Sequence, residues 1–208
     1  MKKNIKLSLA VKALKTIETF TFQFNAITQS RGGGGISSMY AKLARSVWDC
    51  DNAAQFQIVL AEMKEKFSDR LPNLAEFQLA FSQLIYRNDL TRYKDLVRYA
   101  MEKLQRAQGW KTETDFDVLT VEHIINQTGG KRTESSDDCG AVGNLILISE
   151  ELNSKLGDKS PTEKMKILSA SKIPLGDVLD GATNWGYEDI VKRGNALAEL
   201  GYNEVWVL

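Results

Sequence analysis

The sequence predicts an α+β fold that is mostly α-helical, and three observations support this. Apolar residues recur at helical spacing through most of the first 110 residues. Two short runs, 118–125 and 145–148, are rich in β-branched or aliphatic residues and interrupt that pattern. Helix-start signals then return from Ser149 onward. We therefore predict a helical bundle over residues 1–110 and a second domain over 111–208, in which two strands are followed by further helices.

The first half contains a series of segments with helical spacing. The first, 5–17, has an apolar stripe with lysines between its members. Residues 19–24 then alternate polar and aromatic side chains, which predicts a short extended or turn-like segment, with a continued helix as the alternative. The remaining helices of this half are expected over 39–48, 52–66, 73–86 and 93–107.

A run of four glycines at residues 32–35 follows Arg31. No regular element should contain such a run, because glycine loses the most conformational freedom on folding. Beside Arg31 the glycines could cradle a phosphate at a helix N-terminus. They lack the preceding strand, Lys and Thr of a P-loop, so a flexible linker is the more common explanation.

The second half is predicted to run strand, loop, strand, helix. Residues 118–125 form the first strand, 126–140 a polar loop, and 145–148 the second strand. Ser149 followed by two glutamates is typical of a helix start, since a hydroxyl caps the first turn and acids favour it. Further helices are expected over 161–168 and 185–201.

Composition excludes several classes of protein. The formal net charge is zero, so no global basic field favours a nucleic-acid partner, and any such partner must use local patches. Two distant cysteines are too few for a disulfide framework or a thiolate zinc site. No signal peptide and no apolar run near the roughly 18 residues of a membrane span are present. We therefore expect a cytoplasmic protein without a membrane partner.

The residues with catalytic potential gather between 121 and 155. His123, the single histidine of the chain, follows Glu122, and Asn144 and Asn153 lie downstream. Hydrolysis of a phosphodiester needs a base for water and a cation for the phosphoryl oxygens. Histidine suits the first role, and a carboxylate with an amide oxygen suits a Mg²⁺ ion. This pattern is typical of a one-metal nuclease site, although adjacent residues of a regular strand point to opposite faces.

The same stretch resembles the HNH, or His-Me finger, superfamily, and more closely the C-terminal nuclease domain of GmrSD-type restriction proteins. Residues 22–41 resemble a helical region that precedes the nuclease in such proteins. The C-terminal helix of the family is resembled at four positions of this chain, Trp185, Ile190, Arg193 and Leu197. The motifs of the central stretch are Glu122-His123-Ile124, the run Gly143-Asn144-Leu145-Ile146-Leu147-Ile148-Ser149, then Asn153-Ser154-Lys155-Leu156, and finally Lys164.

This resemblance implies a ββα-metal fold in which His123 is the general base. Glu122 and Asn153 would hold one divalent cation, Mg²⁺ or Mn²⁺, and Asn144 would hold the loop or orient His123. Two departures stand out. Asn126 occupies the position at which relatives usually have proline. Relatives also usually carry an N-terminal nucleotide-binding domain, which for this chain would be a separate domain or partner subunit.

A modest basic stripe near this stretch is a candidate for binding a nucleic-acid backbone. An ordinary solvated face explains such a stripe equally well. Arg31 beside the glycines and the pair Lys131 and Arg132 in the loop have the same standing. The members of the stripe are Lys155, Lys159, Lys164, Lys166 and Lys172, which outnumber Asp158 and Glu163 among them.

The function predicted from these observations is that of a metal-dependent endonuclease module that cuts or nicks DNA. Family resemblance implies bacterial anti-phage restriction as its setting. One alternative is a non-catalytic module that binds a partner protein or nucleic acid and whose HNH site has decayed. Another is an RNA-cleaving toxin, which would use the same chemistry.

Overall fold

The computed structural model describes residues 7–28, 35–87, 92–111, 113–127, 139–171 and 173–208. Within them the chain forms two compact units, one of residues 1–77 with 206–208 and the other of residues 78–205. Each unit is described by itself. The predicted fold class is confirmed, because the described chain is mostly helical with one small antiparallel sheet.

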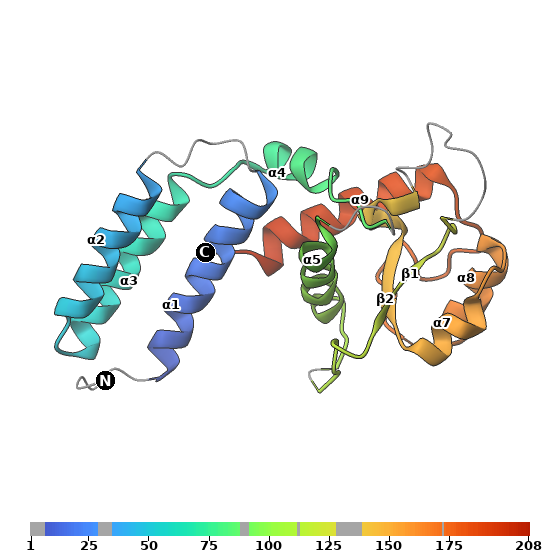
Figure 1. Cartoon of the computed structure of the whole chain (residues 1–208), viewed down its shortest axis with the longest axis horizontal. Coiled ribbons are helices and arrows are strands. Elements are labelled where there is room, and N and C mark those ends of the chain that lie inside the picture. The colour runs from blue at the N-terminus through green and yellow to red at the C-terminus, as the bar shows by residue number, and fades with distance from the viewer. Residues whose placement is uncertain (1–6, 29–34, 88–91, 112, 128–138, 172) are drawn as a thin grey trace. The chain divides into compact units, whose positions relative to one another are not determined.

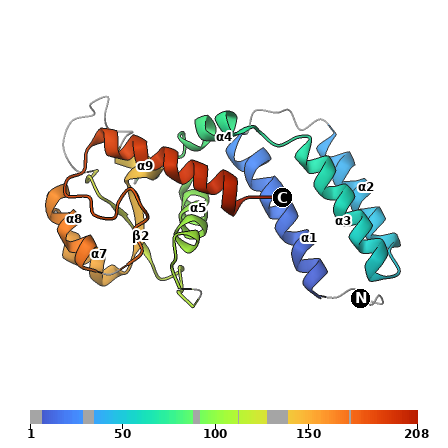
Figure 2. The same cartoon turned by 180° about the vertical axis from the view of Figure 1, so that it is seen from behind.

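The first unit is built from helices that lie side by side (Figures 1 and 2). Asn52 begins one of them by accepting a hydrogen bond from the Gln55 amide at 3.0 Å. Gly35 precedes another with a φ of 84°, a backbone conformation that favours glycine. The helices are α1 (Leu7–Phe20), the π-helical η1 (Thr21–Ile27), α2 (Ile36–Asp49), α3 (Ala53–Ser68) and the start of α4 (Leu74–Phe81).

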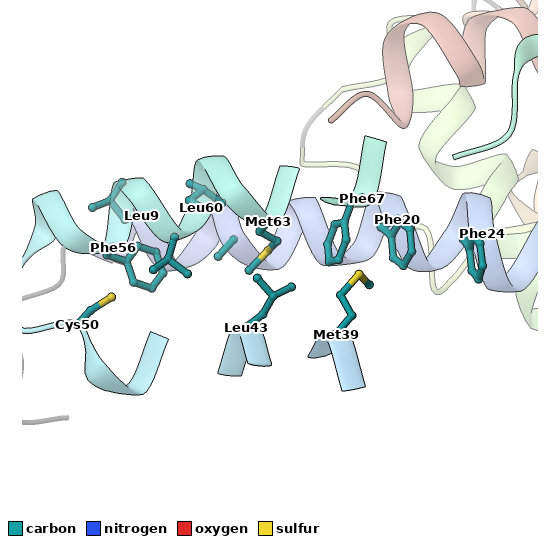
Figure 3. Packing of buried hydrophobic residues seen from close by; sticks show 12 residues of the cluster. Leu9, Phe20, Phe24, Met39, Leu43, Cys50, Phe56, Leu60, Met63 and Phe67 are labelled. Carbon is teal, nitrogen blue, oxygen red and sulfur yellow. The ribbon is translucent and has the colours of Figure 1, made fainter. Parts of the chain in front are cut away.

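The prediction of an extended segment at 19–24 is wrong, because α1 continues into η1 without a break. Phe20 stacks on Phe24 and on Phe67, with ring centroids 5.1 and 4.1 Å apart. Phe22, on another side of the helix, stacks on Trp206 at 3.8 Å. The alternating aromatic pattern therefore reflects a helix buried on two sides. Figure 3 shows the core that Phe20 and Phe24 share with α2 and α3.

The second unit surrounds a two-stranded antiparallel sheet of β1 (Thr120–His123) and β2 (Leu145–Ile148). The predicted second strand matches β2, and β1 is shorter than the predicted run 118–125. The helices of this unit are α5 (Lys94–Ala107), the 3₁₀ turn η2 (Val142–Asn144), α7 (Glu150–Leu156), α8 (Pro161–Ala170), α9 (Tyr187–Leu200) and the π-helical η3 (Gly201–Val205).

The strand β2 is buried along its whole length, because a hydrophobic core covers one face and the helix α5 lies at its outer edge. On one face Ile146 and Ile148 join a core with residues of α7 and α8. At the edge away from β1, the Gln105 side chain of α5 exchanges hydrogen bonds with both backbone groups of Leu147, at 3.0 and 2.7 Å. Gln105 thus satisfies the strand edge as a third strand would.

One further difference from the predicted elements follows from these contacts. The helix predicted over 73–86 ends at Phe81, because Ile85 forms a β-bridge with Ala141 and the Tyr86 amide donates to the Gly140 carbonyl at 2.9 Å. The helix α5 packs on β2 and lies in the same compact unit, which begins at residue 78. No helix of the described ranges has both the length and the apolar character of a membrane span.

Candidate active site

The strand β1 presents its side chains alternately to two faces. Its register with β2 is regular from Thr120 opposite Ile148 to His123 opposite Leu145. Thr120 and Glu122 therefore share one face, and His123 lies on the other. The side-chain contacts agree, because Glu122 meets α8 whereas His123 meets Tyr86. The structure thus does not bring the imidazole and the carboxylate onto one face of the strand.

The Glu122 carboxylate is almost fully buried and is paired with Lys164 of α8. The Lys164 side chain has no exposed surface. Its ammonium donates to Glu122 Oε1, to the backbone oxygen of His123 at 2.8 Å, and to Asn126 Oδ1. All three N–H groups of the ammonium therefore have an acceptor. A buried ion pair with this complete hydrogen bonding can offset its large desolvation cost.

Burial is the main influence on the ionisation of Glu122. It raises the pKa of the carboxyl group, because the charged form loses its hydration. The hydrogen bond from the Lys164 ammonium and its positive charge act in the opposite direction. Glu122 thus depends on Lys164 to carry its charge inside the protein.

His123 is held through one nitrogen of its ring. Nε2 lies 2.9 Å from the backbone oxygen of Tyr86 and 2.7 Å from the side-chain nitrogen of Gln127. The Gln127 nitrogen also donates to the Tyr86 carbonyl at 2.9 Å. A ring protonated at Nε2 donates to Tyr86 and keeps its lone pair on Nδ1, whereas a ring protonated at Nδ1 accepts from Gln127 at Nε2.

The surroundings of His123 favour the neutral ring. Burial lowers the pKa of His123 below its usual 6.5, and the nearby charge of Lys164 acts in the same direction. The hydrogen bond to Tyr86 opposes both influences and is weaker than burial. The imidazole is therefore mostly neutral at pH 7 and able to accept a proton.

Asn144 braces the turn that follows β1. It is fully buried, and its side chain forms a pair of hydrogen bonds with Ile125, from the backbone amide at 3.0 Å and to the backbone oxygen at 2.9 Å. The same amide nitrogen donates to the Cys139 carbonyl at 2.7 Å. Asn144 contacts backbone alone in these bonds, as expected for the residue that holds the loop.

Asn144 is itself held by α9. Arg193 is buried in the interior and donates to the backbone oxygens of Gly143 and Leu145, at 2.8 and 2.7 Å, on either side of Asn144. Burial lowers the pKa of Arg193 to about 10, which still leaves it charged at pH 7. At Gly143 a β-carbon would fall 2.0 Å from the Ile190 carbonyl oxygen, so this close approach requires glycine.

Asn153 belongs to the same face of β1 as Glu122. Ser149 caps α7 by accepting from the Leu152 amide, which places Asn153 on the first turn facing the strand. Its side-chain nitrogen donates to Thr120 Oγ1 at 3.0 Å. Because Thr120 and Glu122 are two residues apart, Asn153 contacts the same face of β1 that carries the Glu122 carboxylate.

Glu122 and Asn153, the two side chains predicted to hold a divalent cation, are both placed on this face, and the Glu122 carboxylate is paired with the Lys164 ammonium. One carboxylate and one amide oxygen on the same face are ligand types that Mg²⁺ prefers. In the described parts of the chain no three His, Cys, Asp or Glu side chains gather in a way that could hold a metal ion. A cation at this face would therefore rely on Glu122, Asn153 and water, with the Lys164 ammonium beside it.

The residues predicted to bind a nucleic-acid backbone have different placements. Lys155 is exposed and pairs with Glu151 at 2.6 Å, and Lys159 is exposed and donates to the Lys155 carbonyl at 2.7 Å. Lys164 is buried against Glu122, which differs from the prediction, since contact with a nucleic acid needs an ammonium that solvent can reach. Arg31, Lys131 and Arg132 lie outside the described residues, as does the glycine run before Gly35.

Sequence reasoning did not identify the parts played by Lys164, Arg193, Tyr86 and Gln127. A signal existed for the first two, because each charge stands at an apolar position of its helix. Lys164 lies one turn before Leu168, and Arg193 lies between Ile190 and Leu197 on the buried face of α9. No local sequence pattern identifies Tyr86, because it contributes a backbone carbonyl, which every residue has.

A family model matches the part of the chain that contains this site. The model of one family, described as the C-terminal domain of GmrSD restriction endonucleases, matches residues 71–200, which is more than half of the chain. The chain belongs to the GmrSD C-terminal domain family. The match includes both strands and every described residue of the candidate active site. Comparison with curated proteins and with solved structures returns no match.

Membership in the GmrSD C-terminal family defines the class of this protein. It is a restriction-endonuclease-related module, and the activity to which the family points is that of a nuclease. The predicted kinship with GmrSD-type proteins is therefore confirmed at the level of the family.

Proposed function

We propose that this chain is an HNH-type, metal-dependent endonuclease module that hydrolyses or nicks phosphodiester bonds in DNA. The observation that carries the proposal is the family match, which spans the segment with His123, Glu122, Asn144 and Asn153. The proposed setting is restriction of foreign DNA in the bacterial cytoplasm. The proposed partners are DNA and a nucleotide-binding domain or subunit outside this chain.

The proposed base is His123. In the tautomer protonated at Nε2, the neutral ring takes the proton of the attacking water at Nδ1 and donates to the Tyr86 carbonyl. That hydrogen bond also stabilises the imidazolium that forms after proton transfer, as a second partner does in other histidine bases. The proposal places the phosphodiester across the end of β1 at His123, where it would be approached from both faces of the strand.

The remaining residues bind and orient. Glu122 and Asn153 would hold the divalent cation from the other face of β1. When bound, Mg²⁺ or Mn²⁺ would supply positive charge to the phosphoryl oxygens and to the leaving group. Asn144 keeps the turn after β1 in place through Ile125, and α9 keeps Asn144 in place through Arg193.

A plasmid-nicking assay tests this proposal. The parent protein should convert supercoiled plasmid to nicked circles with Mg²⁺ or Mn²⁺ and should stop in EDTA. His123→Ala should reduce the rate by about 100-fold or more while its circular dichroism stays unchanged. Lys64→Met, at an exposed position of α3 in the first unit, is the control and should cut at the parental rate. Cleavage by His123→Ala at the parental rate would show that His123 is not the base.

The second candidate function is a non-catalytic binding module. The observation that favours it is the Lys164 ammonium, which already compensates the Glu122 carboxylate. Titration with Mn²⁺, followed by electron paramagnetic resonance, separates the two functions. Binding that disappears in Glu122→Gln and Asn153→Ala supports the endonuclease, and absence of binding supports the scaffold. Parallel digestion of plasmid, single-stranded DNA and RNA identifies an RNA-cleaving toxin if RNA alone is cut.

A further inference from the structure

The turn at 124–127 is held from two sides by buried side chains. On one side Asn144 bonds both backbone groups of Ile125. On the other side Lys164 reaches from α8 to the turn. The turn leads directly from His123 to Gln127, whose amide shares the Tyr86 carbonyl with the imidazole. Its conformation therefore bears on the position of the histidine ring.

The contact with Lys164 joins three parts of this segment through one buried group. The ammonium binds the side chain of Glu122, the backbone oxygen of His123 and the side chain of Asn126. The backbone bond fixes the peptide plane that follows His123. The side-chain bonds fix the residues before and after that plane. A cation with no exposed surface cannot leave these acceptors without a large loss of hydration and hydrogen bonding.

The Asn126 side chain connects the turn to α8. Its Oδ1 accepts from the Lys164 ammonium, whose other two hydrogen bonds go to Glu122 and to the backbone oxygen of His123. This side-chain hydrogen bond therefore restrains the turn three residues after His123.

We propose that Lys164 and Asn126 are a pair of positioning residues that together orient His123, without contact with the substrate. Their effect on DNA cleavage rests on the proposed function. Their effect on the histidine ring does not, because it is a property of the protein alone. The two effects are measured separately.

The single histidine makes the test specific. In a protein labelled with ¹³C-histidine, one imidazole Cε1–H signal reports His123 and nothing else. The parent should show one sharp signal. Asn126→Ala, which removes the acceptor, should broaden or split it, and Asn126→Asp, which keeps Oδ1, should retain a single signal. Lys164→Met should act like Asn126→Ala, and Lys166→Met should leave the signal unchanged.

Cleavage kinetics supply the second readout. In Asn126→Ala, kcat should fall by about tenfold to 100-fold with little change in KM, since a misplaced base slows the chemical step and not substrate binding. Asn126→Asp should recover most of the loss. If Lys164→Met does not fold, because Glu122 is left unpaired, the Asn126 variants decide the question.

The outcomes separate the two proposals. A parental signal and a parental kcat in Asn126→Ala would overturn the positioning pair and leave the endonuclease intact. A parent protein without cleavage would contradict the endonuclease, while a disturbed signal in Asn126→Ala would still support the pair. A signal disturbed equally by Lys166→Met would overturn the pair, since any charge removed from α8 would then have the same effect.

Discussion

At the scale of single residues, buried amide and cationic side chains fix the backbone through hydrogen bonds. Asn144 and Gln105 each form a pair of hydrogen bonds with one residue, Ile125 and Leu147 respectively. Lys164 and Arg193 bind backbone oxygens from the buried sides of their helices. Burial of a polar group costs free energy unless the group is hydrogen-bonded. These four side chains supply hydrogen bonds to backbone groups at irregular turns and at a strand edge, where regular secondary structure leaves them without partners.

The burial of His123 leads to a prediction about pH. The neutral ring is the active form, and burial lowers its pKa below 6.5, so kcat/KM should reach half of its maximum at a pH below 6.5. The rate should decline only in more acidic solution, as pH passes through the lowered pKa. A pH–rate profile between about pH 5 and 8 measures this, and the imidazole signal of the same protein gives the pKa directly. A midpoint above 6.5 in either measurement would contradict the prediction.

At the scale of elements, the site depends on the contact between α9 and η2. Gly143 and Gly194 face each other there, and a β-carbon at Gly194 would lie 4.0 Å from the nearest atoms of Gly143. A β-carbon at Gly143 would instead collide with the Ile190 carbonyl. The two glycines therefore have unequal roles, and the one in the turn before Asn144 sets how closely α9 can approach.

Paired alanine substitutions test this contact. Gly143→Ala should reduce the free energy of unfolding by about 1–3 kcal/mol, because the helix must move away from the turn. Gly194→Ala should raise it by about 0.5–1 kcal/mol, since alanine is the better residue inside a helix and has room. Urea unfolding at equilibrium measures both changes. Equal losses in the two variants would show that the close approach at Gly143 is not the limiting contact.

At the scale of the whole molecule, the chain returns to its first compact unit at its end. Residues 206–208 belong with residues 1–77, although everything between forms the second unit. Trp206 is buried, stacks on Phe22, and accepts a hydrogen bond from Gln23 at its backbone oxygen, at 2.5 Å. The first unit therefore needs the last residues of the chain to complete its core.

Removal of this tryptophan side chain should affect the first unit selectively. Trp206→Ala should cost about 3–5 kcal/mol of stability, in keeping with loss of a large buried aromatic. Trp48→Ala is the control, because Trp48 is 80% exposed, and should change stability by less than about 0.5 kcal/mol. Thermal unfolding measures both variants. The His123 signal should remain as in the parent, and its loss in Trp206→Ala would contradict a selective effect.

The sequence by itself determined the fold class, the position of β2 and the cap at Ser149. These are local properties, which depend on spacing and on residue types a few positions apart. Sequence also anticipated that Glu122 and His123 would face opposite ways, since strand geometry is local too.

Only the tertiary structure decided which side chains meet. The segment 19–24, with its alternating aromatic residues, is helical because α3 and Trp206 bury two sides of it. The helix α5 lies in the same compact unit as β2, and its Gln105 satisfies the edge of that strand. Lys164 was predicted to contact a nucleic acid, but in the structure it is the buried partner of Glu122. Its ammonium also donates to Asn126 Oδ1. Each outcome depends on packing between segments distant in sequence, because a buried charge or strand edge must find its partner wherever the fold provides one.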